Sequence, residues 1–290
     1  MYSTVEVREA GIVGTLAVPD GPGPHPGVVA LSGSGGGIPS WWIDLLVPHG
    51  VAVLAAAYFG VEPLPSALCE IPLEVVAAAG EWLGRQPRVR SGPVGLVGGS
   101  KGAELALLAA TTYPGLFGPV AAIAPSCVAW FGVDLTGGVA DASARSSWTF
   151  DGRPVPFVRP VPGVGFERTE RGLRSVGIYA AALEQADAVV VAAIPVERAA
   201  GPLLLLSGSE DCACPSSVMA RMIVDRMIAH GRGADVRHLD FPGCGHVVVR
   251  PWAPGQAPPT PFDNGGTTEA LDVAHDVALP AVVRHLSGDW

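Results

Sequence analysis

Short runs of apolar residues, separated by longer segments with helical spacing, dominate the chain. Continuous apolar runs occur at Gly27–Leu31, Val51–Ala57, Val94–Val97, Pro119–Ala124 and Gly201–Leu206. A strand without polar alternation is typical of a parallel sheet that is covered on both faces. We therefore predict an α/β fold with a mostly parallel central sheet and helices on both faces.

The segments between these runs predict the helices and the remaining strands. Residues 4–18 alternate between apolar and polar positions, which is typical of one or two strands, with a turn or bulge at Gly11 and Gly14. Ser40 is expected to cap the first helix, because a serine side chain can accept a hydrogen bond from a free N–H of the first turn. Helices are expected at 40–49, 71–85, 103–110, 215–229 and 268–287, and a last strand at 234–241.

Residues 125–200 interrupt this rhythm. The segment is rich in turn-forming Gly and Pro, and within it only 179–191 favours a helix. A long excursion between two core strands is often a lid over a binding site. We expect one domain over residues 1–290, with an inserted cap or lid at 125–200. Its aromatic residues either line a substrate pocket or pack the insertion onto the body: Trp130, Phe131, Trp148, Phe150, Phe157 and Phe166.

The five residues from Gly98 to Gly102 join a buried strand to a helix-forming segment. Their sequence is Gly-Gly-Ser-Lys-Gly, and a strand that turns into a helix at Gly-x-Ser-x-Gly is a nucleophile elbow. Ser100 is expected to adopt a strained backbone there, and Gly98 and Gly102 are needed because a Cβ would collide with neighbouring backbone. The alternative is an ordinary Gly/Ser turn, since short matches to this motif also arise by chance.

A second glycine-rich loop, Ser32–Gly37, follows the first buried strand. It lacks the Gly-Lys-Ser/Thr ending of a phosphate-binding P-loop, and it lacks the Gly-x-Gly-x-x-Gly pattern of a dinucleotide site. In a hydrolase, this loop supplies one N–H group of the oxyanion hole. We expect the backbone N–H of Lys101, with that of Ser34 or Gly35, to bind the oxyanion. A flexible surface loop is the alternative.

Three residues with the chemistry of a catalytic triad follow predicted core strands. They are Ser100, Asp211 and His246, in the chain order of the α/β-hydrolase triad. A serine hydroxyl becomes a good nucleophile when a neutral imidazole removes its proton, and a carboxylate orients that imidazole. Glu210 is the alternative acid, but the shorter Asp211 at the end of the loop is preferred. The other histidines precede the elbow or lie in predicted helices and strands: His25, His49, His230, His238, His275 and His285.

Composition narrows the classes of partner. Hydrophobic residues make up 49% of the chain and charged residues 16%, so a sizeable core is expected. The net charge of −9 argues against nucleic acid as a partner. We find no secretory signal and no apolar stretch long enough to span a bilayer, and we expect a cytoplasmic location. The odd number of cysteines, without a secretory signal, indicates reduced thiols. Cys212, Cys214 and Cys244 are expected to be small apolar residues of the interior; a metal site is the alternative, but Cys-x-Cys with a distant cysteine is not a usual zinc spacing. No cofactor or metal is therefore expected.

Several longer motifs carry a family resemblance that covers almost the whole chain. They are Gly14–Pro19, Gly33–Gly37, Ala57–Gly60, Val94–Leu105, Ile194–Arg198, Gly208–Asp211 and Pro242–His246. In these stretches and in their order, the chain resembles the catalytic domain of the acyl-CoA thioesterase and bile acid-CoA:amino acid N-acyltransferase family, which is itself similar to dienelactone hydrolases. The resemblance implies an α/β-hydrolase fold, with Ser100 as nucleophile, His246 as base and Asp211 as acid. It also implies a small-molecule acyl thioester as substrate.

Departures from the family pattern limit what the resemblance implies. Cys214 replaces the aromatic residue that is common after the acid loop, and the excursion at 125–200 is where the likeness is weakest. The nucleophile is Ser100, whereas the members that conjugate amino acids use cysteine. The sequence therefore favours a serine hydrolase that cleaves acyl thioesters, with carboxylesterase, lactonase or acyltransferase activity as the alternative. Acyl chain, leaving group and oligomeric state stay open.

Overall fold

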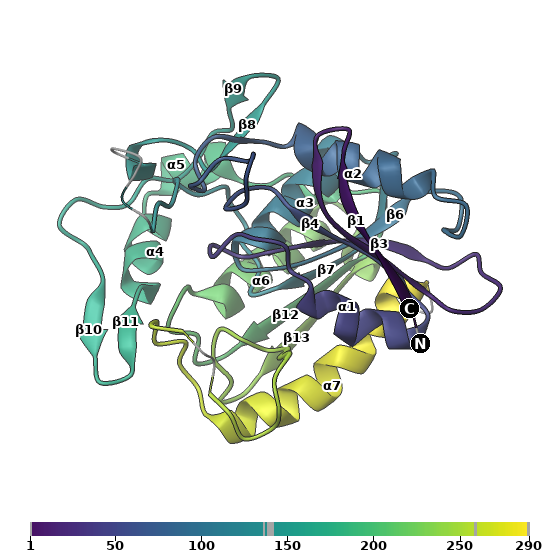
Figure 1. The fold of residues 1–290 in the computed structure, drawn as a ribbon. Helices are drawn as coiled ribbons and strands as arrows, with labels where there is room; N and C mark the ends of the chain where they lie inside the picture. Colours follow the sequence, from purple (N-terminus) through teal and green to yellow (C-terminus); the bar gives the residue numbers. More distant parts are fainter. Residues whose placement is uncertain (1, 136, 138–141, 258–259, 289–290) are drawn as a thin grey trace.

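The central element of the protein is an eight-stranded sheet with the strand order β1-β2-β4-β3-β6-β7-β12-β13 (Figure 1). A computed structural model describes residues 2–135, 137, 142–257 and 260–288. β1 and β2 pair antiparallel with each other, and β2 pairs antiparallel with β4, whereas the other six strands are parallel. The predicted mostly parallel sheet is confirmed. Its strands are β1 (Tyr2–Glu9), β2 (Ile12–Pro19), β3 (Gly27–Leu31), β4 (Ala52–Ala57), β6 (Val94–Gly99), β7 (Phe117–Ile123), β12 (Leu203–Gly208) and β13 (Val236–Phe241).

Helices cover both faces of the sheet, and each face has its own hydrophobic core. The side chains of the buried strands alternate between these two cores, because successive residues of a strand point to opposite faces. This explains why the central strands lack polar positions. One face carries α2 (Glu74–Gly84), α3 (Lys101–Thr112) and α6 (Ser216–Ala229), and the other carries α1 (Trp41–Leu46) and α7 (Thr268–Ser287).

Two of the predicted helices differ from the structure at their ends. Ser40 precedes α1, but its side chain makes no capping hydrogen bond, so the predicted cap is wrong; Pro48 lies in the 3-10 turn Val47–His49 that follows α1. The helix expected at 71–85 begins only at Glu74, because Ile71–Pro72 forms the short strand β5. β5 pairs with β8 (Trp148–Phe150) of the excursion, and this distant partner overrides the local helical pattern.

The excursion at 125–200 is built from short elements. β8 and β9 (Arg153–Pro154) form a small sheet with β5, and β10 (Glu167–Thr169) pairs with β11 (Gly172–Arg174). The helix expected at 179–191 is two helices, α4 (Val176–Leu183) and α5 (Ala186–Ala192). Residues 136 and 138–141 of the expected lid lie outside the described residues, as do 258–259 of the proline-rich stretch before α7.

The six aromatic residues of the excursion divide by burial. Trp130, Phe131 and Trp148 are buried, whereas Phe150 and Phe166 are 45% and 54% exposed. Phe157 is partly buried against the core.

Of the described helices, none has the length and apolar character that a membrane-spanning segment requires.

Candidate active site

Ser100 lies at the junction of β6 and α3 in a strained backbone conformation. Its φ and ψ angles are 56° and −120°, a region that non-glycine residues rarely occupy. A Cβ at Gly98 would lie 2.4 Å from the backbone of Gly102, and a Cβ at Gly102 would lie 2.3 Å from the carbonyl oxygen of Ser32. Both glycines are therefore required by close backbone contacts. Ser100 N–H donates to the carbonyl of Ile123 at 2.8 Å, which fixes the turn against β7.

Asp211 and His246 are hydrogen-bonded to each other beyond the carboxyl ends of β12 and β13. Nδ1 of His246 lies 2.8 Å from Oδ2 of Asp211. The hydroxyl of Ser216 donates to the same carboxylate oxygen at 2.6 Å, and the N–H groups of Ala213 and Cys214 donate to Oδ1 at 2.8 and 3.0 Å. Four donors thus hold an almost fully buried carboxylate in one orientation. Glu210, the alternative acid, is exposed.

The hydrogen bond between Asp211 and His246 sets the tautomer and the basicity of the imidazole. Burial lowers the pKa of His246, but the charge of Asp211 and the hydrogen bond to it outweigh burial, so the pKa is raised above its usual value. With Nδ1–H donated to Asp211, Nε2 is the nitrogen that can accept a proton. Ser100 Oγ makes no hydrogen bond with any described residue in this structure.

The loop that carries His246 is fixed by a close neighbour, residues 263–265. His246 N–H donates to the carbonyl of Asn264 at 2.7 Å, and a Cβ at Gly245 would lie 2.3 Å from that oxygen. Asp263, whose side chain is inaccessible to solvent, accepts from Arg174 of β11 at 3.0 Å. The hairpin of the excursion therefore supports the histidine loop.

The oxyanion hole was expected to use the N–H of Lys101 with that of Ser34 or Gly35, and none of these three candidate groups has a partner among the described residues. Gly36 N–H, by contrast, donates within its own loop to Gly33. Gly33 packs against Ser100, since a Cβ on it would lie 3.7 Å from Cβ of Ser100.

Tyr58, which directly follows β4, is hydrogen-bonded to the Ser32–Gly37 loop. Its buried hydroxyl donates to the carbonyl of Ser32 at 2.7 Å and lies 3.4 Å from the carbonyl of Gly33. Burial raises the pKa of Tyr58, so the phenol stays protonated and remains a donor. Tyr58 was not among the predicted site residues, although its position in the Ala57–Gly60 motif was a signal.

The side chain of Lys101 forms a buried ion pair that the sequence analysis also missed. Its ammonium lies 2.9 Å from Glu104 Oε2 and donates to Ser147 Oγ at 2.8 Å. Glu104 Oε1 accepts from the backbone N–H of Trp130 at 2.8 Å and from the indole of Trp148 at 2.5 Å. The spacing of three residues on one helix face was the available signal. The pair joins the first turn of α3 to the excursion.

Cys214 completes a tight group with the acid and the histidine. Its sulfur lies 3.7 Å from Asp211 Oδ2 and 3.8 Å from His246 Nδ1, so these three residues could in principle ligate a metal ion. Burial, followed by the charge of Asp211, raises the pKa of the Cys214 thiol well above its usual range. A protonated thiol is a poor ligand, and the carboxylate is already saturated with donors. The group therefore fits a hydrogen-bonded acid–histidine pair better than a metal centre. All five cysteines have free thiols.

Comparison with known proteins places this geometry in a family. A family model described as BAAT / Acyl-CoA thioester hydrolase C terminal matches residues 71–260. The chain belongs to this family. The match includes the elbow, the acid loop and the histidine loop.

Curated relatives of this family carry thioesterase and acyltransferase names. Mouse acyl-coenzyme A thioesterase 6 is 33% identical over 257 residues, and rat acyl-coenzyme A amino acid N-acyltransferase 2 is 30% identical over 250 residues. Mouse peroxisomal succinyl-coenzyme A thioesterase is 29% identical over 255 residues. Each alignment covers 86% of this chain and 55% of the relative, so the chain spans about half the length of these proteins.

Solved structures show the same fold at lower sequence identity. An esterase from Pyrobaculum calidifontis aligns with a TM-score of 0.60 at 15% identity, covering 99% of this chain and 85% of that one. A dienelactone hydrolase-like promiscuous phosphotriesterase from metagenomic libraries aligns with a TM-score of 0.57 at 14% identity, covering 99% and 98%. The predicted α/β-hydrolase fold is confirmed.

Proposed function

We propose that the protein hydrolyses acyl thioesters through a Ser100–His246–Asp211 triad and an acyl-enzyme intermediate. The observation that carries the proposal is that all three residues follow the carboxyl ends of parallel strands, β6, β12 and β13, at one edge of the sheet. Ligands of such sheets bind at this edge. The strained serine and the paired carboxylate and imidazole are the parts that nucleophilic acyl transfer requires.

The first half-reaction transfers the acyl group to the protein. Nε2 of His246 removes the hydroxyl proton of Ser100 while Oγ bonds to the thioester carbonyl carbon. The N–H groups of Lys101 and of Ser34 or Gly35 bind the oxyanion, and one such donor contributes about 3 kcal/mol to transition-state stabilisation. The C–S bond then breaks, and the imidazolium of His246 gives its proton to the leaving thiolate. Asp211 stabilises the imidazolium throughout.

The second half-reaction releases the acid. A water molecule donates a proton to Nε2 of His246 and attacks the carbonyl carbon of the acyl-serine. The same N–H groups bind the second oxyanion. The C–Oγ bond breaks, His246 returns the proton to Ser100, and the free carboxylic acid leaves.

A panel of acyl-CoA substrates, with detection of the free thiol, tests this proposal. The wild-type protein is expected to hydrolyse at least one thioester, and Ser100→Ala is expected to lose this activity. Ser91→Ala, in the exposed loop before β6, is the matched control and should retain full activity. A fluorophosphonate probe should label wild-type Ser100 and leave Ser100→Ala unlabelled. Equal turnover by wild type and Ser100→Ala would disprove the proposal.

A second candidate function is acyl transfer to an amine. It is favoured by the relatives that are named amino acid N-acyltransferases, of which the rat protein is 30% identical to this chain. The same acyl-serine would then react with an amino group in place of water. Addition of glycine to the thioesterase assay, with mass spectrometry of the products, separates the two: N-acylglycine indicates transfer, and free acid alone indicates hydrolysis.

A further inference from the structure

We propose that the cavity beside the Ser34–Gly35 loop binds the acyl chain of the thioester, and that it selects an uncharged apolar chain over one that ends in a carboxylate. This inference rests on the proposed thioester hydrolysis and adds the substrate class. The cavity has a volume of about 390 Å³, which is within the usual size of small-molecule sites. Its wall is largely apolar and includes Phe59, Val61, Leu64, Ala67, Val133 and Leu135.

The cavity is continuous with the predicted oxyanion hole. Ser34 and Gly35 line it directly, and the adjacent Gly33 packs against Ser100. Gly37 N–H donates to the carbonyl of Phe59 at 3.1 Å, which fixes the cavity wall to the same loop. A carbonyl carbon attacked by Ser100, with its oxygen on these N–H groups, therefore has its substituents at the mouth of the cavity.

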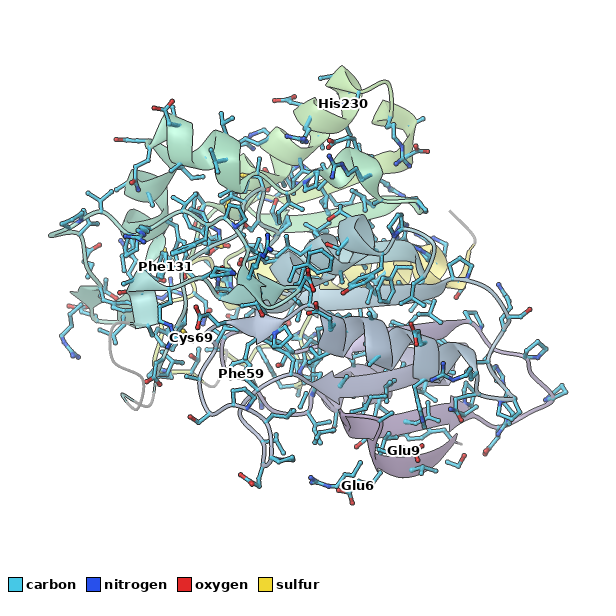
Figure 2. All side chains as sticks on the ribbon, turned by 90° about the horizontal axis from the view of Figure 1, so that it is seen from above. Glu6, Glu9, Phe59, Cys69, Phe131 and His230 are labelled. Carbon is cyan, nitrogen blue, oxygen red and sulfur yellow. The ribbon has the colours of Figure 1, made fainter. Side chains whose placement is uncertain are left out.

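Two segments distant in the sequence are hydrogen-bonded to form the wall. Leu68 and Val133 exchange backbone hydrogen bonds of 3.0 and 2.8 Å. Next to them, the carbonyl of Phe131 accepts from the buried ammonium of Lys101 at 3.3 Å. Figure 2 shows Phe59, Cys69 and Phe131 at the same end of the molecule. Glu6 and Glu9 lie at the β1 edge, and His230 lies on the opposite side of the molecule from them. The wall is thus anchored to the elbow helix, as a fixed binding surface requires.

The negative charge of Glu62 on the cavity wall favours the apolar acyl chain over the anionic parts of the substrate. Among the described lining residues, Glu62 is the only charged one, and none is a cation. Arg8 donates to the backbone carbonyl of Glu62 at 3.1 Å, but its guanidinium is paired with Glu6. The phosphates of coenzyme A and a terminal carboxylate on the acyl chain would both be repelled by Glu62. The apolar acyl chain is therefore the part of the thioester that this cavity accepts.

A comparison of two substrates that share the coenzyme A leaving group tests the proposed selectivity for an uncharged acyl chain. Butanoyl-CoA and succinyl-CoA have acyl chains of equal length and differ by the terminal carboxylate, and we expect butanoyl-CoA to have the higher kcat/KM. Glu62→Gln should reduce this preference by roughly fivefold, because it removes one repulsive charge near the surface. Glu81→Gln, which makes the same change on the exposed face of α2, is the matched control and should leave the preference unchanged.

A change of cavity volume tests where the chain lies. In wild type, kcat/KM should rise by roughly fourfold per added methylene group until the cavity is full. Ser66 is an exposed lining residue, so Ser66→Phe adds a large side chain at the cavity wall without disturbing the core. This variant should lose at least about tenfold in kcat/KM for octanoyl-CoA and stay within about twofold for acetyl-CoA. Ser91→Phe, at the opposite end of β6 from the elbow, is the control for the added phenyl group.

Binding without turnover separates the failure of this inference from the failure of the proposed function. Calorimetry with octanamide and the Ser100→Ala protein should show binding, and the added Ser66→Phe should weaken it at least about tenfold. If thioesters are cleaved while Ser66→Phe affects acetyl-CoA and octanoyl-CoA equally, the chain does not enter this cavity. If octanamide binds as predicted but no thioester is cleaved, the cavity assignment holds and the proposed reaction is wrong. Equal use of succinyl-CoA and butanoyl-CoA would overturn the charge selectivity.

Discussion

The protein has two buried acid–base pairs, Asp211–His246 and Glu104–Lys101, and they are built differently. In the pair Asp211–His246, the carboxylate has four donors, but the imidazole uses only Nδ1 and leaves Nε2 available. In the pair Glu104–Lys101, both groups are buried and the ammonium contacts Glu104, Ser147 and the carbonyl of Phe131. In the proposed mechanism the first pair moves a proton, whereas the second pair joins α3 to the excursion.

The two pairs also differ in how the pKa of the basic group, His246 or Lys101, is shifted. Burial lowers the pKa of both His246 and Lys101, and the neighbouring carboxylate opposes this effect in each case. For His246 the carboxylate wins and the pKa is raised, whereas for Lys101 burial wins and the pKa is lowered. A buried ion pair costs desolvation energy, so the pair at Lys101 contributes more to a defined geometry than to stability.

The largest expected effect is the loss of catalysis when the Asp211–His246 pair is broken. Asp211→Asn keeps the shape of the side chain but removes the charge that orients His246 and stabilises its protonated form. We expect kcat to fall by about 10³ to 10⁴ while the melting temperature changes by only a few degrees. Steady-state kinetics and thermal unfolding measure the two quantities. Glu210→Gln is the control, and a comparable loss there would identify the wrong acid.

The second-largest effect is a loss of stability when the Lys101–Glu104 ion pair is broken. Lys101→Met leaves Glu104 charged and unpaired in the interior, so we expect the free energy of unfolding to fall by about 3–5 kcal/mol. The double variant Lys101→Met/Glu104→Gln removes both charges and should recover most of this loss. Urea unfolding of Lys101→Met, Glu104→Gln and the double variant gives the coupling energy. Additive effects would show that the two side chains do not interact as the structure indicates.

A smaller effect is expected at Tyr58, whose hydroxyl donates to the loop of the predicted oxyanion hole. Tyr58→Phe removes the donor to Ser32 and leaves its buried carbonyl short of a partner, so stability should fall by about 1–2 kcal/mol. As the loop loses its support, kcat should fall by about tenfold with little change in KM. A purely structural role would lower stability and leave kcat unchanged. Tyr2→Phe, at the partly exposed edge strand, controls for loss of a tyrosine hydroxyl.

The last prediction concerns the pH dependence of catalysis, whose acid limb reports the pKa of the base. His246 acts as a base only when neutral, so kcat/KM should fall by about tenfold per pH unit below its pKa. Because Asp211 raises this pKa above the ordinary value of 6.5, the midpoint of the acid limb should lie above 6.5. In Asp211→Asn the residual activity should show a lower midpoint. An acid limb at the same pH in both proteins would contradict the assigned cause of the shift.

The sequence predicted the elements around the nucleophile well because their signals are local. A strand buried on both faces needs a continuous apolar run, and a turn with no room for a Cβ needs glycine, so β6, Gly98 and Gly102 are readable without a structure. The excursion was predicted less well. Its single expected helix is two helices. Outside the excursion, β5 was expected to be part of a helix, and it forms because Ile71 pairs with Trp148, which is 77 residues away.

By itself, the sequence determined the chemistry that is available: a serine in an elbow, an acid and a histidine after later strands, and an α/β sheet to carry them. Tertiary structure alone decided which side chains surround that chemistry. Tyr58 contacts Ser32, Lys101 contacts Ser147, and residues 59–67 meet Val133 and Leu135 at a cavity. Periodicity records whether a residue is buried, but the partner across a core depends on how distant segments pack, and no local pattern contains that information.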